Sequence, residues 1–240
     1  MPQQKNCFYF LGITVILIFL AFLVCFSGCS SSLPRINPPG KKDASQVQKQ
    51  CRQAFPHGKW RFTHSIQVNI SDKKRMSLMG ISQVKPETNS LHCILMTIEG
   101  MVIFEAKYED HNTTIIRSVP PFDSSRFAKR LMQDVKFIFL FPEGKCIDTG
   151  LIDNSHYICR YAIDKSHIND IQVHKNKKKW SLHQYKHGKK VRTLQAKTNS
   201  SSQEQSRHQH PEKLIFKAYN PSNNYTLKMD LIKAKNLNKD

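Results

Sequence analysis

The sequence lacks the short motifs that identify most enzyme classes. Its 240 residues contain no GxSxG elbow, no HExxH zinc motif, no Walker phosphate loop and no GxGxxG fingerprint. No CxxC pair is present, so neither a zinc ribbon nor a thioredoxin-type site has support. Two histidine pairs, His183 with His187 and His208 with His210, lie beside a predicted turn and in a polar loop rather than on one helix face. We therefore predict that the protein is not an enzyme and has no catalytic residues, no metal site and no cofactor.

Long apolar segments are also scarce, and the one present lies near the start of the chain. It runs over residues 8–26 after a single positive charge, Lys5, and ends at Ser27-Gly28-Cys29. A charged tip, an apolar segment and small residues are the layout of an export signal with its cleavage site. The alternative is an uncleaved membrane helix, because about 20 apolar residues span a bilayer.

The cysteine that directly follows the small residues resembles the lipobox of bacterial lipoproteins. That resemblance implies cleavage after residue 28 and attachment of a lipid, such as a palmitate chain, to Cys29. Lipoproteins of the inner membrane often carry aspartate at the next position, where this chain has Ser30, so the resemblance implies an outer-membrane protein that faces the periplasm. Either reading of the segment places the remaining chain beyond the membrane that it crosses.

Acidic residues are few compared with basic ones. Asp and Glu number 18 against 37 Lys and Arg, which gives a formal net charge of +19. Such an excess attracts polyanions and anionic lipid surfaces. Because an exported, lipid-anchored chain would rarely meet nucleic acid, we expect a membrane partner and no nucleic acid. A lysine-rich surface that is simply solvated explains the charge equally well.

The chain divides into three predicted parts. Residues 1–28 are a signal peptide, 29–46 are a flexible tether rich in Ser, Pro and Gly, and 47–240 are a single β domain. The domain is expected to be a monomer. It contains four cysteines, Cys51, Cys93, Cys146 and Cys159, an even number in an oxidising compartment. They allow three pairings among which the sequence does not choose, and four buried free thiols are the alternative.

Alternation of apolar and polar residues predicts most of the strands. Over residues 60–70 it has period two for eleven residues, which indicates a half-buried antiparallel strand. Further strands are predicted near 75–81, 91–98, 101–108, 113–119, 157–163, 171–173, 180–182, 214–218 and 225–231, together about ten. Short helical segments are predicted at about 44–54 and 124–140, the second capped by Asp123 or Ser124. The fold class is mainly β with one interior helix, an antiparallel half-open β-barrel in which that helix is a lid.

Three stretches resemble a family of bacterial lipoproteins that is itself similar to the lipoprotein carrier LolA and the outer-membrane receptor LolB. They are LMTIEGMVIFEAKYED (95–110), DVKFIFLFP (134–142) and PEKLIFKAYNPSNNYTLKMDLIKA (211–234). The resemblance implies a half-open β-barrel with a helical lid over an apolar cavity that receives the acyl chains of a lipid or lipoprotein. The polar segment 198–210 and the positive charge depart from the family's pattern.

These patterns lead to two sets of candidate site residues. The candidates for the lipid cavity share an inward-facing position on a strand or on the lid; they are Ile66, Val68, Ile103, Phe137, Phe139, Phe141 and Leu227. The candidates for an anionic surface lie in the basic segment 174–192; they are Lys177, Lys178, Lys179, Trp180, Lys189 and Lys190. For Trp180 the alternative is a place in the core, and His64 is expected to be a core histidine with satisfied hydrogen bonds.

The predicted function is a non-enzymatic outer-membrane lipoprotein that binds acyl chains during envelope biogenesis. Burial of those chains would drive binding, at about 0.8 kcal/mol for each methylene group removed from water. The alternative is a structural or assembly lipoprotein whose curved sheet docks a protein partner in the periplasm.

Overall fold

The computed structural model describes residues 33–39, 43–70, 74–153, 155–198, 210–219 and 224–238. The chain forms two compact units, residues 1–32 and 33–240, and all described residues belong to the second. The predicted signal peptide and the lipidation site at Cys29 therefore lie outside the described residues. Within the described ranges, no helix is both long enough and apolar enough to cross a membrane.

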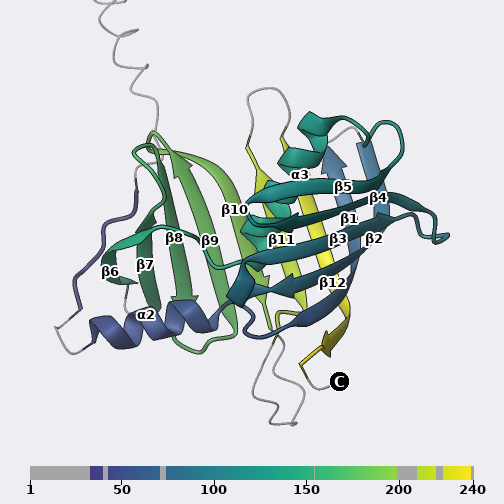
Figure 1. Cartoon of the computed structure of the whole chain (residues 1–240). Coiled ribbons are helices and arrows are strands. Elements are labelled where there is room, and N and C mark those ends of the chain that lie inside the picture. Colours follow the sequence, from purple (N-terminus) through teal and green to yellow (C-terminus); the bar gives the residue numbers. More distant parts are fainter. Residues whose placement is uncertain are drawn as a thin grey trace, which may run out of the picture. The chain divides into compact units, whose positions relative to one another are not determined.

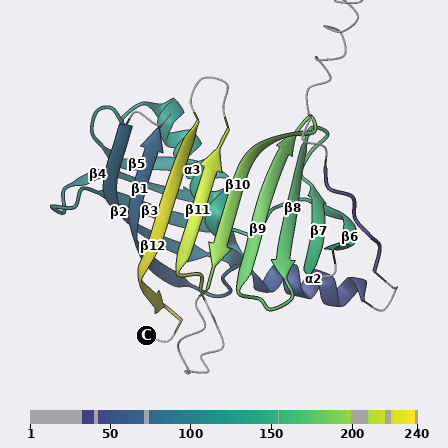
Figure 2. The same ribbon diagram turned by 180° about the vertical axis from the view of Figure 1, so that it is seen from behind.

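The described part of the chain forms one antiparallel sheet of twelve strands, in the order β5-β4-β3-β2-β1-β12-β11-β10-β9-β8-β7-β6. The sheet is open, with β5 and β6 at its two edges, and it curves so that one face is concave (Figures 1 and 2). The strands are β1 (Trp60–Ile70), β2 (Lys74–Lys85), β3 (Ser90–Met96), β4 (Val102–Glu109), β5 (Asn112–Ser118), β6 (Lys145–Asp153), β7 (His156–Ala162), β8 (His167–His174), β9 (Lys179–Lys186), β10 (Lys189–Lys197), β11 (Lys213–Ala218) and β12 (Tyr225–Asn236). The predicted fold class is confirmed.

Strand β1 shows why the concave face becomes the core. Trp60, Phe62, His64 and Ile66 are buried at alternate positions, while Arg61 is exposed between the first two. The strand pairs along its whole length with β2 on one side and β12 on the other. Because successive side chains point to opposite faces of a sheet, this alternation places the aromatic side chains of β1 on the inner face.

Helix α3 (Ser125–Phe139) packs against that inner face. The side chain of Ser124 accepts a hydrogen bond from the backbone N–H of Phe127 at 3.2 Å, so Ser124 is the cap, out of the two that the sequence allows, Asp123 and Ser124. The helix ends at Phe139, and its C-cap Leu140 is extended, two residues before Pro142, which cannot continue a helix. A short 3₁₀ turn (Pro86–Thr88) separates β2 from β3.

Helix α2 (Ala44–Gln53) is a second helix, which lies against β6, β7 and β8. A disulfide joins its Cys51 to Cys159 of β7 across 108 residues of sequence. Cys93 and Cys146 are free thiols, so the cysteines nearest in sequence, Cys146 and Cys159, are not the bonded pair. The disulfide fixes the helix to one half of the sheet.

The structure differs from the expected organisation at the start of the folded unit and at one edge strand. Residues 145–153, which are not among the predicted strands, form β6. Asn37, inside the predicted tether, exchanges two backbone hydrogen bonds with Leu151, of 2.9 and 3.0 Å. A Cβ atom on Gly150 would lie 2.1 Å from the carbonyl oxygen of Asn37, so only glycine lets the two backbones approach this closely. The compact unit that contains the described residues begins at Leu33.

Candidate functional site

A cavity of about 440 Å³ lies at the end of the sheet where β1 begins; we call it cavity 1. This volume is within the range of sites that bind small molecules. The residues that line it come from α2 and the loop after it, from β1, α3, β8, β9 and β11, and from chain segments next to these strands. They are Gln50, Gln53, Ala54, Phe55, Pro56, His57, Phe62, His64, Ile138, Phe139, Val173, Lys177, Trp180, Thr198, His210, Pro211 and Leu214.

The lining of cavity 1 changes from buried aromatic side chains to exposed polar ones. Phe62 and Phe139 are 4% and 5% exposed and stack with their ring centroids 5.6 Å apart. Phe55 packs on Trp180 at 4.9 Å. Gln53, in contrast, is exposed at the end of α2. The cavity therefore has an apolar interior and a polar mouth, which is the character of a site for an amphiphile.

His64 is the buried polar group of cavity 1. It is 2% exposed, and its Nδ1 has no hydrogen-bond partner within the described part of the chain. The expectation of a satisfied core histidine is therefore wrong at this atom. Burial lowers the pKa of His64 to about 4, so the ring is neutral at pH 7. A neutral imidazole has one donor and one acceptor nitrogen, and a polar ligand atom inside the cavity can pair with Nδ1.

A smaller cavity of about 250 Å³, cavity 2, lies against a different face of α3. Gln133, Lys136, Phe137 and Leu140 line it at helical spacing, whereas Ile138 and Phe139 line cavity 1. The rest of its lining comes from the loops beside α3 and from β8 to β10; these residues are Asn89, Phe141, Pro142, Glu143, Ile163, Asn169, Leu182, Gln184 and Arg192.

A buried ion pair beside cavity 2 connects α3 to the sheet. Arg192 of β10 forms an ion pair with Asp134 of α3 at 2.8 Å and donates a hydrogen bond to Gln184 at 2.9 Å. The hydroxyl of Tyr225 donates a further hydrogen bond to Asp134. Burial raises the pKa of Asp134, and the guanidinium of Arg192 opposes that rise. Nearby, Lys136 donates to the hydroxyl of Tyr108 at 2.5 Å.

The candidates for the lipid cavity are divided between the two cavities and the core. Phe139 lines cavity 1, while Phe137 and Phe141 line cavity 2. Ile103 and Ile66 are buried in the core, and Ile66 fills the space above Gly80, where an added Cβ would lie 2.5 Å from its Cδ1. Val68 and Leu227 face each other across β1 and β12 and are partly buried.

The sequence reasoning did not select Phe62 and His64, although both share the inner face of β1 with Ile66. The alternation identified the correct face of the strand. The alternation did not indicate where along β1 the cavity lies, because the position of the cavity depends on where α3 crosses the sheet. A buried histidine in an aromatic run was the available hint.

The candidates for an anionic surface do not form one patch. Lys177 and Lys178 lie in the turn between β8 and β9 and Lys179 begins β9, whereas Lys189 and Lys190 begin β10, beyond the other end of β9. Eight strand residues separate the two turns, which is roughly 24 Å. Trp180 is 9% exposed and lines cavity 1. It therefore lies in the core, which was the alternative prediction for this residue.

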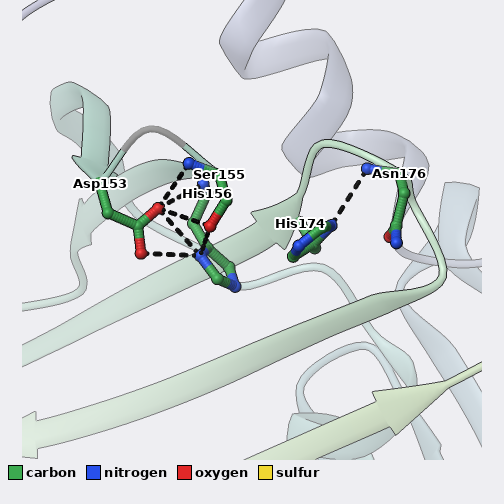
Figure 3. A network of polar contacts seen from close by, with 5 residues as sticks. All are labelled: Asp153, Ser155, His156, His174 and Asn176. Atoms are coloured by element: carbon green, nitrogen blue, oxygen red, sulfur yellow. Dashed lines mark hydrogen bonds and ion pairs between the residues drawn. The ribbon is translucent and has the colours of Figure 1, made fainter.

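Two turns bring together aspartate, serine and histidine side chains. In the β6–β7 turn, Asp153 accepts hydrogen bonds from the backbone and hydroxyl of Ser155 and lies 3.0 Å from Nδ1 of His156 (Figure 3). These backbone and hydroxyl hydrogen bonds lower the pKa of Asp153. Asp164, Ser166 and His167 repeat the arrangement at the other end of β7.

This arrangement is a turn and not a catalytic triad. Ser155 lies 2.9 Å from the same nitrogen, Nδ1 of His156, that Asp153 contacts, whereas a triad histidine uses one nitrogen for the acid and the other for the serine. His174 packs edge-on against His156 at 4.8 Å and accepts a hydrogen bond from the backbone of Asn176 (Figure 3). The described residues include no group of three His, Cys, Asp or Glu that could hold a metal ion.

Comparisons with known proteins find similar structures at low sequence identity. A LolA superfamily protein from Nitrosomonas europaea is 13% identical, with 80% of this chain and 92% of that chain covered and a TM-score of 0.47. A domain described as an outer membrane lipoprotein-sorting protein from Vibrio parahaemolyticus is 8% identical, with 82% and 93% covered and a TM-score of 0.47. A DUF1329 family protein from Desulfovibrio piger is 12% identical, with 84% and 94% covered and a TM-score of 0.40.

A scan against protein-family models finds no match, and a search of curated proteins finds none either. The similarities found are of fold alone, at 8–13% sequence identity.

Proposed function

We propose that this chain is a non-enzymatic, lipid-anchored protein of the bacterial envelope that binds the acyl chain of a lipid or lipoprotein in cavity 1. The observation that carries the proposal is a cavity of about 440 Å³ with an apolar interior, an unpartnered buried nitrogen and a polar mouth. Contact of an alkyl chain with Phe62, Phe139 and Leu214 would remove each methylene group from water, at about 0.8 kcal/mol.

The location in the envelope rests on two features of the chain. The apolar segment 8–26 followed by Cys29 has the layout of a lipoprotein signal. The disulfide between Cys51 and Cys159 suits an oxidising compartment such as the periplasm. Together they support export and attachment to a membrane, with the outer membrane as the proposed site.

Native mass spectrometry of the full chain released from membranes tests ligand binding. We expect a fraction of the protein to carry a non-covalent adduct with the mass of an acyl lipid, lost on collisional activation. Metabolic labelling with a palmitate analogue tests the anchor, and we expect labelling of the natural chain but not of Cys29→Ala. Protein that carries no adduct and takes up no fluorescent fatty acid would overturn the proposed binding, whatever the labelling shows.

A further inference from the structure

Cavity 1 has an electrostatic asymmetry that its apolar interior does not explain. Among its lining residues, Lys177 is the one Lys or Arg, and none is Asp or Glu. Within the described residues, no carboxylate lies within ion-pair distance of Lys177. The mouth of the cavity therefore carries positive charge next to an apolar interior.

The backbone of Lys177 strengthens this observation. Its φ is +60°, in the left-handed region that glycine and asparagine adopt more readily than lysine. The turn is closed by a hydrogen bond from the N–H of Lys177 to the carbonyl of His174 at 2.7 Å. Lysine therefore occupies a turn position where the backbone alone favours another residue.

More lysines crowd the same end of the sheet. Lys179, Lys197 and Lys213 lie directly opposite one another on the neighbouring strands β9, β10 and β11. Like charges that face each other across strands are destabilising. The ammonium of Lys213 lies 3.9 Å from the carboxylate of Asp230. Both side chains are more than half exposed, so this ion pair contributes little to stability. Trp180 and Leu214, the residues next to Lys179 and Lys213, line cavity 1, so this row of lysines points to the opposite face of the sheet and is not part of the mouth.

We propose that cavity 1 selects amphiphiles with an anionic headgroup, which pairs with Lys177 at the mouth while the alkyl chain lies against Phe62 and Phe139. The inference rests on the proposed function, since it requires that the cavity bind an alkyl chain. Another part of the mouth is the carboxyl end of α2, near Gln53, where free carbonyl groups carry partial negative charge. The headgroup is therefore expected on the side of the β8–β9 turn.

Energy transfer from the chain's two tryptophans to N-phenyl-1-naphthylamine, an uncharged apolar probe, reports occupancy of the cavity, because Trp180 is part of its lining. The full chain is held in phosphatidylcholine nanodiscs, with empty discs as the blank. The competitors are octyl phosphate, octanol, octyltrimethylammonium and inorganic phosphate. We expect octyl phosphate to displace the probe at a concentration at least tenfold below that of the other two octyl compounds, and inorganic phosphate not to displace it.

The variant Lys177→Asn removes the ammonium and leaves a residue that suits the left-handed turn, so the fold is preserved. We expect octyl phosphate to compete about fivefold less well, as for the loss of one lysine at an anionic surface, with octanol unchanged. The matched control is Lys189→Asn at the opposite end of β9, which should leave competition by both compounds unchanged. Raising the salt concentration to 0.5 M should reduce the preference in the natural chain.

Equal competition by the three octyl compounds would overturn this inference and leave the proposed function intact. So would a Lys177→Asn effect that is the same for octyl phosphate and octanol. Displacement by inorganic phosphate alone would also overturn it, because the site would then bind a bare anion. Absence of energy transfer to the probe would overturn the proposed function and this inference with it.

Discussion

Cavity 1 and cavity 2 lie against different faces of the carboxyl-terminal half of α3, and only the side of cavity 2 has an ion pair, within the described residues, that holds the helix to the sheet. Beside cavity 2, Asp134 has both Arg192 and Tyr225 as partners, so the helix is fixed to β10 and β12 on that side. In cavity 1, Nδ1 of the buried His64 has no partner within the described residues. Oδ1 of Asn169, which lines cavity 2, also has no partner within the described residues, so the two sides of α3 differ in the ion pair that holds the helix and not in a full satisfaction of polar groups.

The largest effect is expected at the ion pair beside cavity 2. The variant Asp134→Ala leaves the partly buried guanidinium of Arg192 without its carboxylate, which should reduce the free energy of unfolding by about 4 kcal/mol. Urea unfolding measures this loss. The double variant Asp134→Leu with Arg192→Met removes both charges and should regain most of the stability. A loss below 1 kcal/mol in Asp134→Ala would show that the pair does not fix α3.

The disulfide should affect cavity 1 more than cavity 2, because α2 contributes Gln50 and Gln53 to cavity 1 only. Replacement of Cys51 and Cys159 by alanine should reduce the free energy of unfolding by about 3 kcal/mol. Hydrogen exchange should show reduced protection of the amides of α2 and unchanged protection in α3. Cys146→Ala, at a free thiol, is the control. Equal loss of protection in both helices would contradict the separation.

Acid should destabilise the fold through buried histidines. Burial lowers the pKa of both His64 and His183 to about 4 from 6.5, with Lys190 adding to the effect at His183. Between these values the unfolded chain binds protons that the folded chain does not. The stability from the neutral rings is therefore fully present above pH 6.5 and is lost as the pH falls toward 4.

Between pH 7 and pH 5, each of the two rings should account for a loss of about 2 kcal/mol in the free energy of unfolding. Urea unfolding at the two pH values measures the sum, and the variant His64→Leu should remove one of the two contributions. An unfolding free energy that is the same at both pH values would contradict the burial of these neutral rings.

The smallest effects on stability are expected when each of the two buried histidines is replaced by leucine. His183 lies 3.0 Å from the hydroxyl of Ser181 and 3.3 Å from that of Thr193, whereas Nδ1 of His64 has no partner within the described ranges. His64→Leu should therefore raise the free energy of unfolding at pH 7 by about 1 kcal/mol, and His183→Leu should lower it by a similar amount. Chemical denaturation of the two variants measures both changes in the free energy of unfolding. Destabilisation by His64→Leu would indicate a partner for Nδ1.

Much of the fold could be predicted because single segments carry strong patterns. The alternation over Trp60–Ile70 gives β1, and the spacing of Phe127, Leu131 and Val135 with Ser124 before them gives α3. Strand β6 was missed because it is an edge strand with register shifts after Cys146 and Leu151, so its exposed residues do not alternate.

The cavities and the disulfide could not be predicted because they depend on long-range packing. Cys51 meets Cys159 only because α2 lies on β7, a contact that no local pattern encodes. In the same way, periodicity selected Ile66 on the correct face of β1, but the open space lies beside Phe62 and His64. The basic residues of the two turns were predicted to form one surface because they are close in sequence, but strand β9 places the turns at opposite ends of the sheet.

Filling each cavity in turn tests the central claim most directly. Ala54→Phe places a ring in cavity 1, and Gln133→Phe places one at cavity 2 from the exposed face of α3. Ala44→Phe, at the other end of α2 and away from both linings, controls for the added ring. Uptake of N-phenyl-1-naphthylamine, measured by energy transfer from tryptophan, should fall at least tenfold in Ala54→Phe and stay unchanged in the other two. Unchanged uptake in Ala54→Phe, or loss in Gln133→Phe alone, would contradict cavity 1 as the ligand site.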